Sequence, residues 1–286
     1  MLRALSAGMS ASRRFYRHQI GANAWSQTRG LPRSTTGLTA LTSVLVLLCA
    51  TSGLLVPGFY QKSDPNLLAG SYGQDVTSLV ALIVVAWALP SAHRGSQRGQ
   101  TVLAGLLLYY FYGYFLYFFG PQSTSLYPLY VAIPSLAFFA LSLMWSRVDF
   151  HGLRTTLEGR LPSRSIILLF GATVVSLTPV WLVLMASDNR RGEPSPFAGV
   201  YFLDLGFVFP ALTVAAVGLW QRRPWSYALA GPLLILEAWM MLSLVVSEVM
   251  ASLRGTPDAV PLAVVFALFA LSATLLSRTY LVMVKT

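Results

Sequence analysis

The sequence predicts an all-α polytopic membrane protein, a transmembrane helix bundle of about eight spans. Of the 286 residues, 55% are apolar and only 10% are charged, whereas soluble domains carry about 25% charged residues. The apolar residues gather in runs of about twenty, the length that crosses the core of a bilayer. Most of the charged residues lie between these runs. This composition excludes a soluble globular enzyme and an intrinsically disordered protein.

Eight continuous apolar runs are expected to cross the membrane. Their residues do not alternate between apolar and polar types, so the pattern does not favour a β-barrel. The connecting loops are short and leave no room for an inserted soluble domain. Gly120-Pro121 breaks the third run from the fourth, which predicts a tight hairpin there. The predicted spans are 35–56, 71–90, 101–119, 126–144, 165–185, 201–220, 227–251 and 262–281.

Residues 1–34 precede the first span and contain six arginines and no acidic residue. This composition fits a cytoplasmic arm held at anionic lipid head groups. It also fits an organellar transit segment or an extension from an early start codon. We expect a disordered basic arm, followed by a transmembrane domain over 35–286.

The basic residues predict the orientation of the bundle. Sixteen of the 20 fall on the side of the two termini, and the other four are Lys62, Arg190, Arg191 and Arg254. Cytoplasmic loops carry such an excess of arginine and lysine, so both termini are expected in the cytoplasm of a cell-membrane protein. The expected partners are the lipid bilayer and anionic head groups at the basic side, and not nucleic acid.

Two short sequence matches suggest an internal repeat. The pattern G-x-Y-x-x-D occurs at 70–75 and at 199–204, and Leu-Ala-Gly occurs at 103–105 and at 229–231. Four spans per half would give two parallel halves related by an axis along the membrane normal. Matches this short also arise by coincidence, so a four-plus-four repeat and chance both remain open.

Four acidic residues fall inside the predicted spans: Asp75, Asp204, Glu237 and Glu248. Charge is costly in a bilayer, so each is a candidate functional group. No basic residue lies at their depth, and Glu237 lies close to the midplane. Asp75, Asp204 and Glu237 are therefore predicted to bind a cation or protons. The alternatives are first-turn helix caps for the aspartates, a hydrated Glu248, and a protonated Glu237 that is bonded to a hydroxyl or carbonyl group.

The third span carries nine aromatic residues between 109 and 119. Tyr110, Tyr114 and Tyr117 recur at helical spacing and share one face. We expect Tyr110 and Tyr114 to lie near the acids, where they would donate hydrogen bonds or bind a cation with their rings. The alternative is an interfacial aromatic belt.

The sequence holds no motif for a cofactor or for familiar catalysis. There is no G-x-x-x-x-G-K-[ST], no H-E-x-x-H and no G-x-S-x-G. The three histidines fall in predicted cytoplasmic segments, and the single cysteine, Cys49, forms no intramolecular disulfide. No catalytic residue, cofactor or metal is therefore predicted.

Two segments resemble a family of uncharacterised multi-pass membrane proteins of prokaryotes. One is Tyr72-Gly73-Gln74-Asp75 with the apolar run after it, and the other is 203–210 continued by 218–225. The resemblance covers much of residues 70–250 and implies a membrane protein without implying an activity. In that family a basic residue often stands near the position of Glu237, so the acid here departs from the pattern.

Three function hypotheses follow. The first is a small cation- or proton-coupled transporter or permease. The second is a non-catalytic membrane subunit, an assembly factor or a stress-related component. The third is a membrane enzyme that acts on a lipid or quinone, for which the missing intramembrane histidines are least favourable.

Overall fold

The computed structural model describes residues 30–61, 67–119, 124–192, 195–257 and 259–284. These residues form a helical bundle with eight helices that are long and apolar enough to cross a membrane. The predicted fold class is therefore confirmed. Residues 1–29 of the predicted arm lie outside the described residues, and the last residues of that arm, from Arg33, belong to the first helix.

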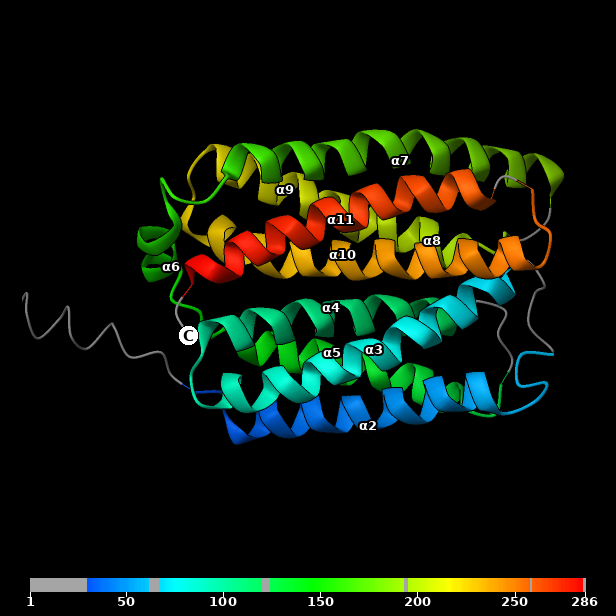
Figure 1. Ribbon diagram of the computed structural model, residues 1–286, viewed down its shortest axis with the longest axis horizontal. Coiled ribbons are helices and arrows are strands. Elements are labelled where there is room, and N and C mark those ends of the chain that lie inside the picture. Colours follow the sequence, from blue (N-terminus) through cyan, green and yellow to red (C-terminus); the bar gives the residue numbers. More distant parts are fainter. Residues whose placement is uncertain (1–29, 62–66, 120–123, 193–194, 258, 285–286) are drawn as a thin grey trace, which may run out of the picture.

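The long helices run in alternating directions along a common axis (Figure 1). Each predicted span corresponds to one of them, with the sixth span divided by a π-helical turn, η2. One short helix, α6, lies in a loop at the end of the bundle. The elements are α2 (Arg33–Leu55), α3 (Leu68–His93), α4 (Gln97–Phe119), α5 (Tyr127–Trp145), α6 (Phe150–Leu157), α7 (Ser163–Arg191), α8 (Ala198–Leu203), η2 (Asp204–Val208), α9 (Phe209–Trp220), α10 (Pro224–Leu253) and α11 (Ala259–Met283).

Helix α7 runs six residues beyond its predicted end at 185. The length of an apolar run reflects the thickness of the hydrocarbon core, whereas the helix itself continues until it meets a residue that terminates it. Here the stop is Gly192, whose φ of 71° is left-handed and is the usual helix-terminating conformation of glycine. The extension brings the polar residues Asp188 and Asn189 onto the helix.

The helices pack as two rings that lie side by side and contact each other. Helices α2, α3, α4 and α5 contact one another in cyclic order, and α7, α9, α10 and α11 do the same. Helix α10 also packs against α3 and α4, which joins the rings. Figure 1 shows α2 to α5 in one half and α7 to α11 in the other. The order of neighbours is the same in both rings, but a repeat axis is not established by it, and the four-plus-four repeat stays a prediction.

The two ends of the bundle differ in charge. The arginine-rich end, as we call it, carries α6 and the turns at 94–96, 146–149 and 221–223. There Arg98 donates hydrogen bonds to the carbonyl oxygens of Val284 and Val282, both at 3.0 Å. These bonds reach carbonyls at and just beyond the end of α11, where the last carbonyls of a helix lack intrahelical donors. The opposite end carries the C-terminus of α7 and the N-terminus of α8.

Candidate functional site

Asp75 lies in a buried tyrosine cluster. It is one to two turns from the N-terminus of α3, which lies at the end of the bundle opposite the arginine-rich end. Its side chain is 1% exposed. Tyr60, which follows α2, donates to Asp75 Oδ2 at 2.6 Å, and the hydroxyl of Tyr117 lies 3.1 Å from Oδ1. The Tyr117 hydroxyl also lies 2.9 Å from the carbonyl oxygen of Ser71. The rings of Tyr60 and Tyr117 stack at 6.3 Å between centroids, so both phenols approach the carboxyl group in a fixed orientation.

The hydrogen bonds around Asp75 are compatible with the neutral acid. A tyrosine hydroxyl has one hydrogen to donate, yet Tyr117 has two oxygen acceptors within bonding distance. If Tyr117 donates to Ser71, the contact with Asp75 Oδ1 requires a hydrogen on Asp75. With that proton in place, all three short contacts are satisfied.

Asp204 begins the π-helical turn that interrupts the sixth span. The N–H of Phe209 bonds to the carbonyl oxygen of Asp204, five residues back. Pro210 follows, and proline has no N–H and collides with the carbonyl four residues before it in a regular helix. A wider turn relieves that collision at Gly206. Turns of this kind are frequent at functional sites.

The Asp204 side chain fits the carboxylate form. It is 3% exposed, and each oxygen receives one donor: Tyr112 of α4 bonds to Oδ1 at 2.9 Å, and Trp181 Nε1 of α7 bonds to Oδ2 at 2.8 Å. The indole N–H only donates. No added hydrogen is needed to account for these two contacts.

Glu237 lies midway along α10 and is 3% exposed. Its Oε1 forms a short hydrogen bond with Thr173 Oγ1 of α7, and that hydroxyl also lies 3.1 Å from the carbonyl oxygen of Leu169. The single threonine hydrogen is shared between the two acceptors or bonds fully to only one of them. A protonated Glu237 that donates to Thr173, while Thr173 donates to Leu169, satisfies both contacts. Oε2 of Glu237 has no partner among the described residues.

The described contacts divide the predicted acids among three clusters. Tyr112 and Tyr117 are five residues apart on α4, which turns them about 140° from each other around the helix axis. Asp204 and Asp75 therefore approach α4 from different sides, and Glu237 is bonded from α7. Among the described residues no group of three or more His, Cys, Asp or Glu side chains is placed to hold a metal ion.

Tyr110 and Tyr114 are buried, but their hydrogen bonds go to backbone carbonyls. Tyr110 contacts Ser78 O and Tyr114 contacts Val46 O, both at 3.4 Å. The ring of Tyr114 packs on that of Tyr117, with centroids 5.5 Å apart. Tyr114 thus lies one ring away from Asp75, and a direct role for either tyrosine stays a prediction.

Four side chains that bond the acids were not selected from the sequence: Tyr60, Tyr112, Thr173 and Trp181. Tyr60 follows a span, where no helical periodicity relates it to a partner. Thr173 and Trp181 are isolated polar groups in an apolar run, and their roles depend on which helix faces meet. Tyr112 belongs to the aromatic block of the third span, but on a different face from the one singled out.

The fold and its eight apolar helices define a multi-pass integral membrane protein. Comparison of the chain with protein-family models, with curated proteins and with solved structures finds no match.

Proposed function

We propose that the protein is a small proton-coupled transporter in which Glu237 and Asp75 take up and release protons. The supporting observation is the position of Glu237: it is a buried acid midway along a membrane helix, its Oε2 has no partner among the described residues, and its Oε1 contacts a hydroxyl that can either donate or accept. Ionisable groups at this depth commonly form proton relays in pumps and transporters.

The Thr173 hydroxyl supports a two-state exchange at Glu237. In the neutral state the acid donates to Thr173, which donates to Leu169 O. On loss of the proton, rotation of the hydroxyl would turn its hydrogen toward Glu237 instead. The carboxylate would then retain one hydrogen bond, and an entering cation would replace the lost positive charge.

The proposal is tested in proteoliposomes that contain a pH-sensitive dye and are diluted into Na⁺ or K⁺. We expect the cation gradient to change the internal pH with the wild-type protein, and Glu237→Gln to abolish the change. Glutamine can donate to Thr173 as the neutral acid does, so folding is retained while proton exchange is lost. Glu248→Gln, which removes a partly exposed acid from the same helix, should behave as wild type. Equal pH changes with wild type and Glu237→Gln would exclude the role of Glu237.

A second candidate is a non-catalytic membrane subunit. It is favoured by the separation of the acids into three clusters, since a transporter commonly gathers its polar groups around one binding site. Helices α7 and α11 have the least buried apolar windows of the eight spans and would be the ones to meet a partner. An isolated subunit of this kind would give no pH change in the vesicle assay, either as wild type or with Glu237→Gln.

We further propose that the protein lies in the cell membrane with the arginine-rich end in the cytoplasm, facing anionic lipid head groups. The excess of arginine at that end supports this orientation. Asn189→Cys should react with an impermeant thiol reagent in intact cells, and Thr155→Cys only after permeabilisation. Both positions are exposed and lie at opposite ends, and the native Cys49 is buried. The reverse labelling pattern would overturn the orientation.

A further inference from the structure

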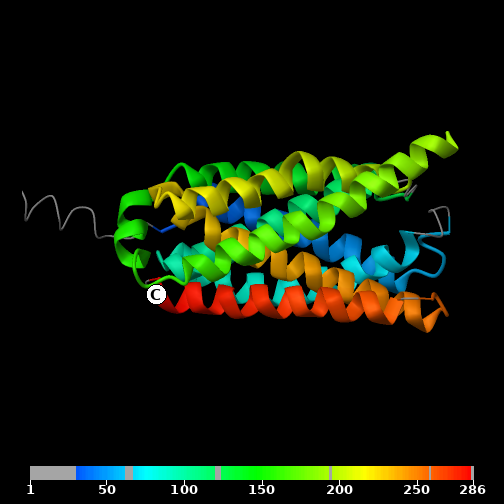
Figure 2. The same cartoon turned by 90° about the horizontal axis from the view of Figure 1, so that it is seen from above.

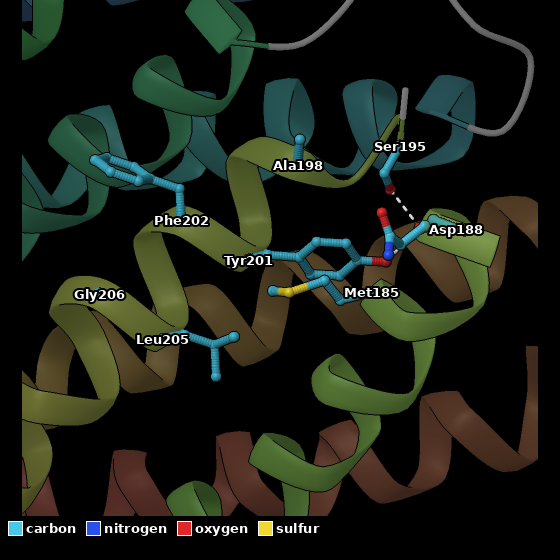
Figure 3. A pocket seen from close by; sticks show the side chains of 9 residues that line it. Met185, Asp188, Ser195, Ala198, Tyr201, Phe202, Leu205 and Gly206 are labelled. Atoms are coloured by element: carbon cyan, nitrogen blue, oxygen red, sulfur yellow. Dashed lines mark hydrogen bonds between the residues drawn. The ribbon is translucent and has the colours of Figure 1, made fainter. Parts of the chain in front are cut away.

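A hollow of about 600 Å³ opens on the surface between the end of α7 and the start of α8 (Figure 3). It is about the size of a small-molecule site. Helix α7 contributes Met185, Asp188 and Asn189, and the following segment contributes residues from Ser195 to Gly206. The hollow therefore begins at the opposite end of the bundle and continues toward the π-helical turn.

One wall of the hollow presents oxygen acceptors. Ser195 Oγ and the Tyr201 hydroxyl donate to Asp188 Oδ2, at 2.5 and 2.9 Å, and Figure 3 shows both groups directed at this carboxylate. Asp188 Oδ1 receives no hydrogen bond from the described residues, and Asn189 adds an amide oxygen nearby. Arg191, one turn farther along α7, is near enough for its charge to act on Asp188 but forms no salt bridge with it in the described structure. An acid with an unused oxygen therefore faces the hollow.

The remainder of the lining is apolar and extends in depth. Met185, Phe202 and Leu205 line it, and the first two are exposed on the outside of the bundle. The helical segment from Ala198 to Gly206 covers about 12 Å at 1.5 Å per residue. Polar groups thus lie near the end of the bundle, with an apolar track leading toward the bilayer centre.

We propose that this hollow binds an amphiphile with a primary ammonium head group and an alkyl chain. An ammonium group brings three donors and a positive charge, which match the unused oxygen of Asp188 and the oxygens of Asn189 and Tyr201. The alkyl chain lies along Met185, Phe202 and Leu205. No basic side chain is among the residues that line the hollow, so a head group that carries only negative charge is disfavoured.

The hollow is connected to the buried Asp204 through two aromatic rings. Tyr201, which bonds Asp188, packs against Trp181 with ring centroids 5.9 Å apart. Trp181 in turn donates to Asp204 Oδ2 at 2.8 Å. An occupant that displaces the Tyr201 ring changes the surroundings of Trp181, which supplies an optical signal for binding.

The first experiment titrates the protein, in a non-ionic detergent, with dodecylamine while tryptophan fluorescence is recorded. We expect a saturable change that dodecanol and dodecanoate, which share the chain but lack the ammonium group, do not produce. Asp188→Asn keeps an oxygen for Ser195 and Tyr201 but removes the charge, so the dissociation constant should rise about tenfold or more, as for the loss of one charge-assisted hydrogen bond. Glu248→Gln removes another acid near this end of the bundle and should bind as wild type.

A second variant tests the hollow without altering its polar wall. A Cβ on Gly206 would meet open space, so Gly206→Leu fills the hollow and should block binding. Gly171→Leu, also in open space but on α7 outside the hollow, is the matched control. Unchanged dodecylamine binding in both Asp188→Asn and Gly206→Leu, or equal binding of dodecanol by the wild type, would overturn the proposal.

The source of the amphiphile is distinguished in nanodiscs. Phosphatidylethanolamine carries a primary ammonium group, whereas the head group of phosphatidylcholine has no N–H donor. Native mass spectrometry that finds phosphatidylethanolamine retained by wild type, but not by Asp188→Asn, identifies a membrane lipid. Binding of dodecylamine without lipid retention identifies a free amphiphilic amine. These measurements require no ion exchange, so this proposal and the transporter proposal can fail separately.

Discussion

Gly53→Ala should lower the free energy of unfolding by about 1–3 kcal/mol, the usual cost of an extra methyl group in a filled core. Gly53 lies in α2 where this helix meets the Asp75 cluster. A Cβ at this position would overlap the Asp75 carboxylate and lie 2.6 Å from the Tyr60 hydroxyl oxygen. The helix or the cluster must shift, and the bond between Tyr60 and Asp75 weakens. Denaturant unfolding in detergent micelles measures the effect.

The same substitution at Gly37 is the matched control. Gly37 lies in the same helix, and a Cβ there would have nothing within 4 Å. Alanine is a better helix former than glycine by about 0.5–1 kcal/mol, so Gly37→Ala should leave stability unchanged or raise it slightly. Equal effects at the two positions would show that the Asp75 cluster does not depend on the close approach of α2.

Thr173→Val should destabilise the protein by about 1–3 kcal/mol, the cost of a buried polar group that loses its partner. Valine has nearly the same shape as threonine but no hydroxyl. Because Glu237 Oε2 already has no partner in the described structure, this variant leaves both oxygens of the acid without a bond. Thr173→Val combined with Glu237→Met removes the polar groups from both helices and should recover most of the lost stability, since replacing both partners by apolar groups is often nearly neutral.

Thr213→Val controls for the loss of a hydroxyl from a membrane helix. Within the described part of the chain, the Thr213 side chain bonds only to the carbonyl oxygen of Phe209 in its own helix, and it is exposed. We expect the free energy of unfolding of the Thr213→Val variant to differ little from that of the wild type. If Thr173→Val costs no more than Thr213→Val, the bond between α7 and α10 does not stabilise the fold.

Hydropathy alone predicted the eight spans, because a bilayer requires apolar segments of nearly fixed length. It did not predict where the helices end, and α7 shows why: Asp188 and Asn189 are too polar for the run but continue the helix. The short helix α6 was also missed. Its local signal is Asp149, whose side chain accepts a hydrogen bond from the N–H of Gly152 and caps the first turn, as aspartate commonly does.

The candidate site was predictable only as far as the acids themselves. Asp75, Asp204 and Glu237 were selected because a charged side chain inside the bilayer is costly, and all three are buried. Their partners depend on how helices rotate against one another, and a uniformly apolar run does not specify that rotation. Tyr117 shares the predicted tyrosine face and bonds Asp75, but Tyr112 lies on another face and bonds Asp204. A block with aromatic residues on every face cannot reveal which of them meets an acid.

Helix α7 supplies three groups to the sites described above. Thr173 bonds Glu237, Trp181 bonds Asp204, and Asp188 lines the hollow. At 29 residues the helix is about 43 Å long at 1.5 Å per residue, well over the roughly 30 Å of a hydrocarbon core, and Figure 2 shows it crossing the bundle obliquely. A long span adapts to bilayer thickness by tilting. Pro179 lies inside α7 between Thr173 and Trp181 and removes one backbone hydrogen bond of the helix there. A thinner or thicker membrane that changed the tilt of α7 would therefore displace Trp181 and Asp188 together, because both lie on the same side of this proline.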